Sequence, residues 1–268
     1  MNITYISSSG NVYPLMTDRI RVLDANFHAW EFKDVSTDLE YGSRVSRFKK
    51  QAMTYQTKII VRGSRIQRKA ALNVLHDEFE NDLRKLQPGR IIWGEWHCDC
   101  YITSSQTQPY EDGQYITENT VDIFVPSGFW QREETRSFFA SSPAPTGFLE
   151  FPFDIEYDYT TPSASNATWE TDSPFPADFT MKIKGPCVNP RVTVNGYPYI
   201  VNAAIPAGAT LVIDSQYKTV MMGEINLFDA RGKEKSVFAK IPSGGLNIGW
   251  DGFDFDLTLY EERSEPRW

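Results

Sequence analysis

The sequence has little cysteine and no long apolar run. Its 268 residues include only three cysteines, Cys98, Cys100 and Cys187. An odd and low cysteine count argues against a disulfide framework and fits a protein made in a reducing cytosol. No stretch approaches the ~18 consecutive apolar residues of a membrane span, and the first residues lack the basic and apolar segments of a signal peptide. We therefore expect neither a disulfide framework nor a membrane partner.

Positive charge is also in short supply. The chain carries 27 basic and 35 acidic residues, a formal net charge of −8. A general nucleic-acid-binding protein needs a net basic surface that releases counterions from phosphates, and this composition does not supply one. Two local basic runs, residues 43–50 and 61–69, are therefore expected to form ion pairs on a helix or to lie at a subunit contact. The alternative, a contact with phosphates, would use Arg44, Arg47, Lys49 and Lys50.

Motifs for nucleophilic catalysis, dinucleotide binding and phosphate binding are missing as well. The sequence contains no Gly-x-Ser-x-Gly, no Gly-x-Gly-x-x-Gly and no phosphate loop. The most metal-like stretch is "HCDC", in which Cys98 and Cys100 share one face of a strand and His97 points to the other. Two thiolates are too few for a closed tetrahedral zinc site. We expect two small buried side chains in a strand, with no metal and no cofactor.

Paired carboxylates offer the remaining route to catalysis. In the stretch "FDFDLTLY", Asp254 and Asp256 alternate with apolar residues, and this period of two predicts a strand whose acids face solvent. The alternative is a glycosidase, which needs one acid of raised pKa and one ionised partner about 5–10 Å apart. Because the sequence shows no apolar pocket around either acid, we expect no enzymatic activity. The apolar set of this strand is Phe253, Phe255, Leu257 and Leu259.

One segment follows helical periodicity. From Ser64 to Leu86, apolar residues recur at spacings of three and four. Ser64 and Gln67 form the pattern of a capping box at its start, and Gln87-Pro88-Gly89 stops it. We expect one long helix here, with His76 on its solvated side. The apolar set of the helix is Leu72, Leu75, Phe79, Leu83 and Leu86.

Most of the remaining sequence reads as short strands. The runs before residue 140 are "NITYIS", "YQTKIIVRG", "GRIIWGEWHCDCYITSS" and "ENTVDIFVPSGFWQ". Those after it are "FTMKIKG", "PRVTV", "YPYIV", "TLVID", "KTVMM", "FAKIP", "LNIGW" and "FDFDLTLYEE". Asn195-Gly196 is the signal of a type I′ hairpin. Strands with turns every 8–12 residues suggest a β-sandwich or jelly roll for the second group.

Two polar stretches interrupt the strands. Residues 138–148, "FFASSPAPTGF", read as a linker, and residues 160–176 read as a long surface loop. We therefore expect a mainly β protein with two domains. Residues 1–140 form a β-rich domain with one long helix, and residues 141–268 form the β-sandwich. The first holds 17 basic and 18 acidic residues, the second 10 and 17.

The order of several short motifs resembles a known family. In the C-terminal half these are "ADFTMKIKGPCVNPRVTVNG", "IPAGATLVIDSQYKTV", "IPSGGLNIGW" and the ending "LTLYEERSEPRW". In the N-terminal half, strands lead into one amphipathic helix and "LQPGRIIW" returns to strand. Together they resemble the distal tail proteins of long-tailed phages with non-contractile tails. The resemblance covers most of the chain, and residues 144–175 are its least recognisable part.

The resemblance implies a structural role at the phage tail tip. Distal tail proteins form a homohexameric ring whose N-terminal belt domain surrounds a central channel, while a galectin-like sandwich lies outside. The ring joins the major tail tube protein to the tail-associated lysin or fibre hub, and in some phages it anchors receptor-binding proteins. DNA would meet such a ring only in transit through the channel. The resemblance thus implies a virion protein made in the bacterial cytoplasm.

A closed ring needs two different complementary surfaces on each copy. The expected helix is bipolar in charge, with basic residues near its start and acidic residues further on. We therefore expect it to pack near the interface between copies. The candidate interface residues are Arg65, Arg68, Lys69, Asp77 and Glu80.

A carbohydrate-binding module that contacts the host cell wall is the alternative function. Aromatic residues in loops can stack on sugars, and the candidates are Tyr159, Trp169 and Trp250. Sugar-binding galectins use a set of residues that includes a histidine, but residues 147–268 contain none. The second domain is therefore expected to serve as a docking scaffold.

Overall fold

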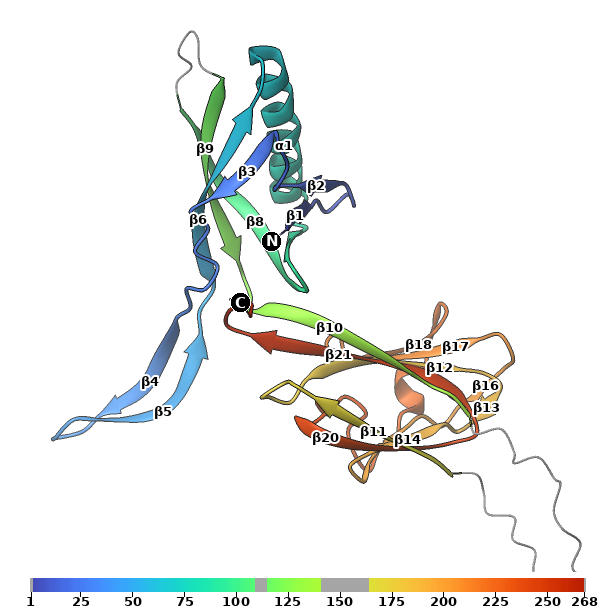
Figure 1. Ribbon diagram of the computed structural model, residues 1–268. Helices are drawn as coiled ribbons and strands as arrows, with labels where there is room; N and C mark the ends of the chain where they lie inside the picture. The colour runs from blue at the N-terminus through green and yellow to red at the C-terminus, as the bar shows by residue number, and fades with distance from the viewer. Residues whose placement is uncertain (1, 109–114, 141–163, 268) are drawn as a thin grey trace, which may run out of the picture. The chain divides into compact units, whose positions relative to one another are not determined.

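The computed structural model describes residues 2–108, 115–140 and 164–267 (Figure 1). These residues form antiparallel strands, one α-helix and one short 3-10 helix. The expected mainly β class with a single long helix is confirmed. Within the described ranges, the structure has no helix with the length and apolar character that crossing a bilayer requires.

The chain packs as two compact units. The first comprises residues 1–132 and 262–268, and the second residues 133–261. Strand β10 (Trp130–Phe138) contains the division, so it contributes to both units. The domain bounds inferred from the sequence, 1–140 and 141–268, stay a prediction.

The first unit contains two sheets that share one long strand. One has the order β2-β1-β7-β8, and the other joins β3, β6, β9 and β8. Strand β8 pairs with β7 from Trp96 to Cys100 and with β9 from Tyr101 to Thr107, with a register shift between Ile102 and Ser104. The elements are β1 (Ile3–Ile6), β2 (Val12–Pro14), β3 (Ile20–Leu23), β4 (Phe32–Asp38), β5 (Ser43–Lys50), β6 (Met53–Arg62), α1 (Arg65–Lys85), β7 (Gly89–Trp93), β8 (Trp96–Thr107) and β9 (Ile116–Val125).

The core of this unit lies between the sheets and α1. Cys98 and Cys100 are 2% and 0% exposed on β8, and both are free thiols. Burial raises the pKa of the Cys98 thiol. No cluster of metal-ligating side chains occurs in the part of the chain that the structure describes. The prediction of two small buried side chains in a strand is therefore confirmed.

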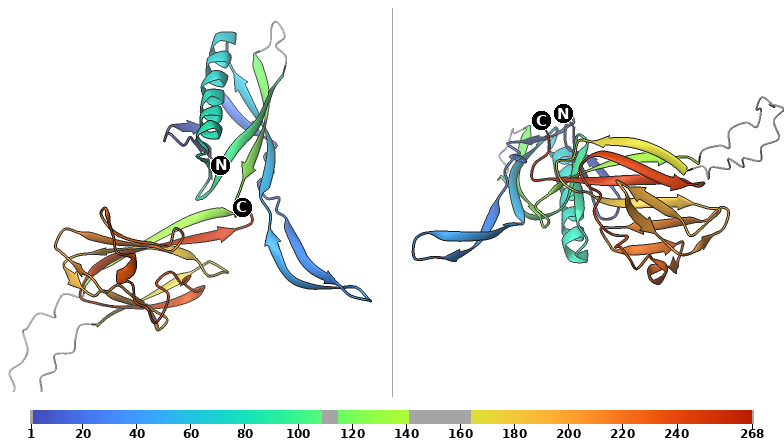
Figure 2. Two further views of the ribbon diagram at one scale, coloured as in Figure 1. Left: turned by 180° about the vertical axis from the view of Figure 1, so that it is seen from behind. Right: turned by 90° about the horizontal axis from the view of Figure 1, so that it is seen from below.

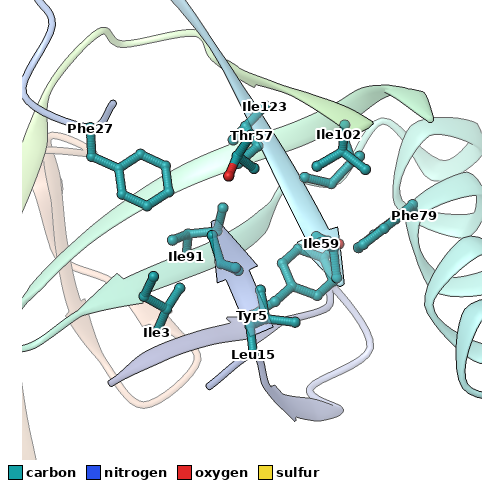
Figure 3. Close-up of a pocket in the computed structure, with 12 residues that line it drawn as sticks. Ile3, Tyr5, Leu15, Phe27, Thr57, Ile59, Phe79, Ile91, Ile102 and Ile123 are labelled. Atoms are coloured by element: carbon teal, nitrogen blue, oxygen red, sulfur yellow. The ribbon is translucent and has the colours of Figure 1, made fainter. Parts of the chain in front are cut away.

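A small void remains in the same core (Figure 3). It has a volume of about 10 Å³ and is enclosed almost entirely by apolar side chains, among them Tyr5, Phe79 and Ile91. That is about the space of one water molecule. An apolar void of this size stays dry and offers no room for a ligand.

The second unit is a β-sandwich. One sheet has the order β19-β18-β17-β12-β21-β10 and the other β11-β20-β14-β15. Apolar residues of both sheets, such as Phe179, Ile248 and Phe255, form one core. The elements are β11 (Ala164–Thr171), β12 (Asp178–Lys184), β13 (Cys187–Val188), β14 (Arg191–Val194), β15 (Tyr197–Ile200), β16 (Ala204–Ile205), β17 (Thr210–Asp214), β18 (Thr219–Met222), β19 (Ile225–Asn226), η1 (Phe228–Ala230), β20 (Gly244–Asp251) and β21 (Asp254–Arg263).

Local sequence signals in this unit fold as expected. The turn Asn195-Gly196 has φ values of 49° and 77° and joins the directly paired Val194 and Tyr197, as a type I′ hairpin requires. Strand β21 alternates between buried and half-buried positions along its length. Asp254 and Asp256 therefore lie on the polar side of the sheet, as predicted, whereas Glu261 is buried on the other side.

Two expectations for this unit are wrong. Residues 164–171, expected in a surface loop, form strand β11, which pairs with β20 from Ala164 to Thr171. The segment was read as a loop because Ser165 and Thr171, which are buried, are polar. Conversely, the run "FAKIP" was expected to form a strand but does not. Its one ladder contact is an isolated bridge between Ile241 and Ala177.

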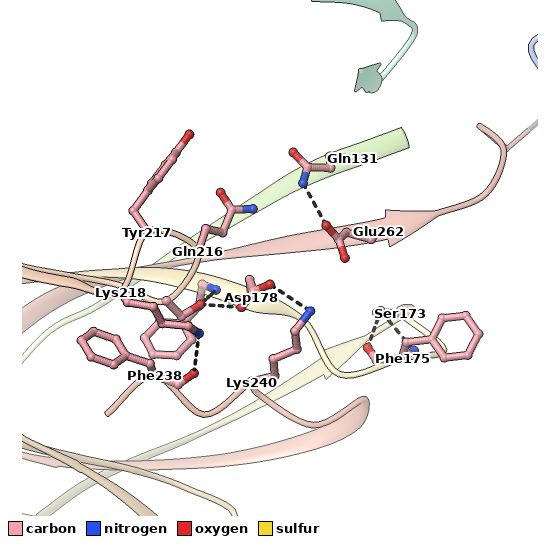
Figure 4. Close-up of polar contacts among 12 residues, drawn as sticks. Gln131, Ser173, Phe175, Asp178, Gln216, Tyr217, Lys218, Phe238, Lys240 and Glu262 are labelled. Carbon is pink, nitrogen blue, oxygen red and sulfur yellow. Dashed lines mark hydrogen bonds and ion pairs between the residues drawn. The ribbon is translucent and has the colours of Figure 1, made fainter. Parts of the chain in front are cut away.

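A polar network ties the start of β12 to two loops (Figure 4). Asp178 accepts hydrogen bonds from Ser215 Oγ at 2.9 Å and from Lys240 Nζ at 2.9 Å. Ser215 is fully buried and its hydroxyl accepts from the Phe179 amide at 2.7 Å. These contacts stabilise the sandwich, and both oxygens of the Asp178 carboxylate have a partner within it.

Candidate interaction surfaces

Helix α1 begins as the sequence predicts. Ser64 is its N-cap, and the reciprocal capping box with Gln67 is present. The helix ends at Lys85, and Leu86 follows in the left-handed conformation with φ of 53°. Leu72, Leu75 and Phe79 are buried against the unit's core. Leu86, expected in the apolar stripe, is 80% exposed instead, because the chain leaves the helix before it can turn inward.

The charged residues of α1 fall into two groups. Arg65, Lys69, Asp77 and Glu80 are exposed, so they remain candidates for an interface. Arg68 is only 3% exposed, and its Nε donates to Thr117 Oγ1 at 2.9 Å. The same guanidinium donates to the Gly63 carbonyl at 2.7 Å. Its charge therefore fastens the start of the helix within the unit.

Asp82 performs the equivalent role at the other end of α1. Its side chain, 1% exposed, accepts hydrogen bonds from the Tyr5 hydroxyl, from the Ser8 amide at 3.0 Å and from Ser8 Oγ at 2.6 Å. Burial, together with this carboxylate, raises the pKa of Tyr5. A Cβ at Gly89 would lie 2.6 Å from the Tyr5 hydroxyl and 2.7 Å from an Asp82 oxygen, so only glycine fits there. Asp82 was missed, although it continues the buried stripe three residues after Phe79.

His76, expected on the solvated side of the helix, faces the sheet. Its Nε2 lies 2.9 Å from Ser105 Oγ and 3.0 Å from Asn119 Nδ2. Burial lowers the pKa of the imidazole, so the neutral form is favoured. The histidine therefore docks the middle of α1 on strands β8 and β9.

The hairpin β4–β5 stands apart from the rest of the first unit (Figures 1 and 2). Its two strands pair only with each other. Every residue of β4 is exposed, as is every residue of β5 except Lys50. The basic run 43–50 is thus a strand of this hairpin and not part of a helix, because its partner strand begins at Phe32.

Lys50 joins the base of the hairpin to the body of the unit. Its Nζ lies 4.7 Å from the ring centroid of Phe32, 5.5 Å from that of Phe129 and 5.9 Å from that of Trp30. Desolvation by these rings lowers the pKa of the ammonium group. Cation–π attraction offsets part of that desolvation. The three aromatic rings around Lys50 therefore fix the base of the hairpin. The rest of its two strands is exposed and has no such contact.

Two of the three aromatic candidates for sugar stacking, Trp169 and Trp250, are buried. Trp169 and Trp250 are 1% and 6% exposed in the sandwich core. The Trp169 indole donates a hydrogen bond to Glu134 at 3.1 Å. The guanidinium of Arg136 lies over the same indole, with its Cζ 4.9 Å from the ring centroid. Tyr159 lies outside the described residues. Stacking on a sugar requires an open ring face, which these two tryptophans do not present.

The carboxylates of β21 lie in a polar network. Asp256 accepts from Ser137 Oγ at 2.6 Å and from Lys184 Nζ at 2.9 Å. The hydrogen bond from Ser137 and the contact with Lys184 lower the pKa of Asp256. Asp254 accepts from the Ala140 amide at 2.7 Å. A glycosidase acid needs a raised pKa, so the environment of Asp256 acts in the opposite direction.

One hollow of ligand size occurs on the described part of the first unit. It has a volume of 330 Å³, within the lower range of ligand sites. Asp99 is its one charged lining residue, and Arg90 pairs with it at 2.8 Å. The one charged group in the lining is therefore already paired. Its other lining residues are Pro88, Cys98, Tyr101, Pro126, Ser127, Phe129 and Gln131.

Comparison with known proteins gives matches in structure but not in sequence. No family model and no curated protein sequence matches the chain. The structure is similar to the Dit protein (gp 19.1) of phage SPP1, described as a paradigm of the hub adsorption apparatus in phages infecting Gram-positive bacteria. Identity is 10% and the TM-score 0.65, over 97% of this chain and 99% of that one.

A second similar structure is a chain of the phage P2 baseplate in its activated conformation with calcium. Identity is 10% and the TM-score 0.61, over 99% of this chain and 100% of that one. A chain of the same baseplate with strontium has 9% identity and a TM-score of 0.62. Both units of the chain are thus matched together. The resemblance drawn from the sequence is confirmed at the level of the fold: this chain has the fold of phage hub and baseplate proteins.

Proposed function

We propose that the protein is a structural component of a phage tail tip and forms a homohexameric ring there. The ring joins the tail tube protein to the tail-associated lysin or fibre hub, and its channel lets DNA pass. The observation that carries the proposal is the match of both units, across nearly the full length, to a hub adsorption protein and to baseplate chains. A coincidental likeness of one β-sandwich would not extend over the first unit as well.

The surfaces of the first unit support an assembly role. Residues of α1 that were expected at an interface, among them Lys69, Asp77 and Glu80, are exposed. Several large apolar side chains are exposed too, including Phe48 at 66% and Ile66 at 82%. A heterologous, ring-closing interface requires two different complementary surfaces, which exposed apolar and charged side chains can supply. Receptor-binding proteins would dock on the outer unit of the same ring.

Light scattering after size exclusion, with negative-stain images of the same fractions, tests the proposal. A ring of about six copies with a central hole is the expected result, since a heterologous interface that closes gives a ring. If the chain alone is smaller, the same measurement is repeated with the tail tube protein added. Absence of a ring in both samples would count against the proposal.

A further inference from the structure

The hairpin β4–β5 has one face that carries only positive charge. The cross-strand pairs Lys33–Lys49, Val35–Arg47 and Thr37–Arg44 each place both side chains on the same face. We propose that this basic face docks on the acidic second unit of a neighbouring copy of the chain. The inference rests on the proposed ring and names one of its contacts.

The basic face is unfavourable on its own. Lys33 and Lys49 lie directly opposite each other, and like charges in that position destabilise a strand pair. Arg47 and Arg44 extend the same charge along the strand. None of the four forms a salt bridge within residues that the structure describes. An isolated two-stranded hairpin is at best marginally stable in water, so an anionic surface over this face would stabilise it.

The opposite face favours a protein over a nucleic acid as the occupant. It carries Phe48 and Val45, which are 66% and 45% exposed, and the two acids Asp34 and Asp38. DNA on the basic face would leave these apolar side chains in water and the two carboxylates near phosphates. A protein partner that encloses the hairpin covers both faces. The tip residues Leu39 and Tyr41, 56% and 88% exposed, favour the same conclusion.

Charge distribution indicates which protein surface fits. The second unit, residues 133–261, contains 9 basic and 17 acidic residues, a net charge of −8, whereas the first unit holds 18 of each. All of the net negative charge therefore belongs to the second unit. Complementary charge steers association and fixes the register of an interface. Exposed acids of this unit include Glu170, Asp172, Glu224, Glu234 and Asp251.

Charge reversal with a matched control tests the contact. The reversed variant carries Lys33→Glu, Arg44→Glu, Arg47→Glu and Lys49→Glu. The control carries Lys33→Arg, Arg44→Lys, Arg47→Lys and Lys49→Arg, which keeps every charge at the same four positions. We expect the reversed variant to associate about 100-fold more weakly at 0.1 M salt, and the control to associate as the wild type does. Circular dichroism of both variants verifies that the fold is retained.

Zero-length cross-linking identifies the surface that the hairpin meets. Carbodiimide joins a lysine amine to a carboxylate, so Lys33 and Lys49 report the acids beside them. A mixture of ¹⁴N- and ¹⁵N-labelled chains separates links between copies from links within one copy. We expect mixed-isotope links from these lysines to acids of residues 133–261.

The outcomes separate this contact from the ring itself. If the wild type forms a ring and the reversed variant forms it equally well, the docking proposal is overturned, while the proposal of a ring still holds. Links confined to one copy, or links to acids of residues 1–132, overturn it too. A duplex DNA that binds the wild type and not the reversed variant, with assembly unchanged, would assign the face to nucleic acid. The absence of both a ring and links between copies would remove the proposed function as well.

Discussion

Helix α1 and hairpin β4–β5 belong to the same unit, yet they use charge in opposite ways. Arg68 and Asp82, near the two ends of α1, direct their charges inward to Thr117, Gly63, Tyr5 and Ser8. The hairpin directs the four cations of its basic face outward, with no partner among the described ion pairs. Helix α1 thus satisfies its buried charges within its own unit, whereas the hairpin presents charges suited to a partner outside the unit. Substitutions should therefore affect stability in the first and assembly in the second.

The largest expected effect is on stability and comes from Asp82. In Asp82→Ala the buried Tyr5 hydroxyl and the Ser8 amide lose their acceptor, which should lower the free energy of unfolding by about 3 kcal/mol. Asp77→Ala, an exposed acid on the same helix, is the control and should change it by less than about 0.5 kcal/mol. Urea unfolding followed by circular dichroism measures both. Equal losses of unfolding free energy in the two variants would contradict the assignment of a stabilising role to the buried carboxylate alone.

A smaller loss is expected at the start of the helix. Arg68→Ala removes the donor to Thr117 and to the Gly63 carbonyl, and we expect a loss of about 2 kcal/mol. Arg65→Ala, an exposed arginine three residues earlier, serves as the control. Amide hydrogen exchange of β6 and β9 reports the unit's local stability. If Arg68→Ala instead impaired assembly while leaving exchange unchanged, Arg68 would belong to the interface.

A pH-dependent effect of still smaller size is expected at Glu78. Burial raises the pKa of this carboxyl, but hydrogen bonds from Asn11 and Tyr13 and the charge of Lys85 outweigh it, so the pKa is lowered from 4.5. A lowered folded-state pKa stabilises the protein above the unfolded-state pKa, and this contribution is lost as the pH falls through the folded-state value.

Glu78→Gln should therefore be less stable than the wild type at pH 7. Because Glu78 is only half-buried, solvent screening keeps the difference below about 1 kcal/mol. Thermal unfolding measured at pH 7 and at several values below 4.5 should show the difference shrinking as the pH falls. A difference that grew towards low pH would contradict the sign of the shift.

The smallest effect on stability should come from the largest change in sequence. Phe32 and Lys50 are directly paired, so an Asn-Gly turn can replace residues 33–49 and close the hairpin at its root. We expect the unfolding free energy of the remaining chain to change by less than about 0.5 kcal/mol, because the removed residues of β4 and β5 are all exposed. Sedimentation velocity should show the ring lost. A destabilised monomer would mean that the hairpin supports its own unit.

Local signals in the sequence predicted the parts of this fold whose causes are local. The capping box at Ser64, the Asn195-Gly196 turn and the alternation in β21 each depend on residues within a few positions of one another. The buried pair Cys98 and Cys100 followed from the same alternation. In each case the residues that decide the structure are neighbours in the chain.

Structure that depends on distant partners was missed. Strand β11 contains enough polar residues to read as a loop, and only its pairing with β20, 73 residues away, makes it a strand. Asp82 is acidic, and its burial depends on hydrogen bonds from Tyr5 and Ser8, which lie 77 and 74 positions earlier in the chain. The hairpin was missed for a third reason, since residues 43–50 were interpreted only as a basic run. For the interface itself, the sequence predicted exposed candidates on α1 but included Arg68, which is buried.

The exposed hairpin also has a consequence for rates. Four cations carried on a two-stranded projection act beyond the contact distance of the unit's body, over a Debye length of about 10 Å at 0.1 M salt. Such charges accelerate encounter with an acidic partner, whereas dissociation depends on the close contacts made afterwards. Ionic strength would then slow the capture of each incoming copy far more than it loosens a finished assembly. The hairpin would thus set how quickly a ring is built.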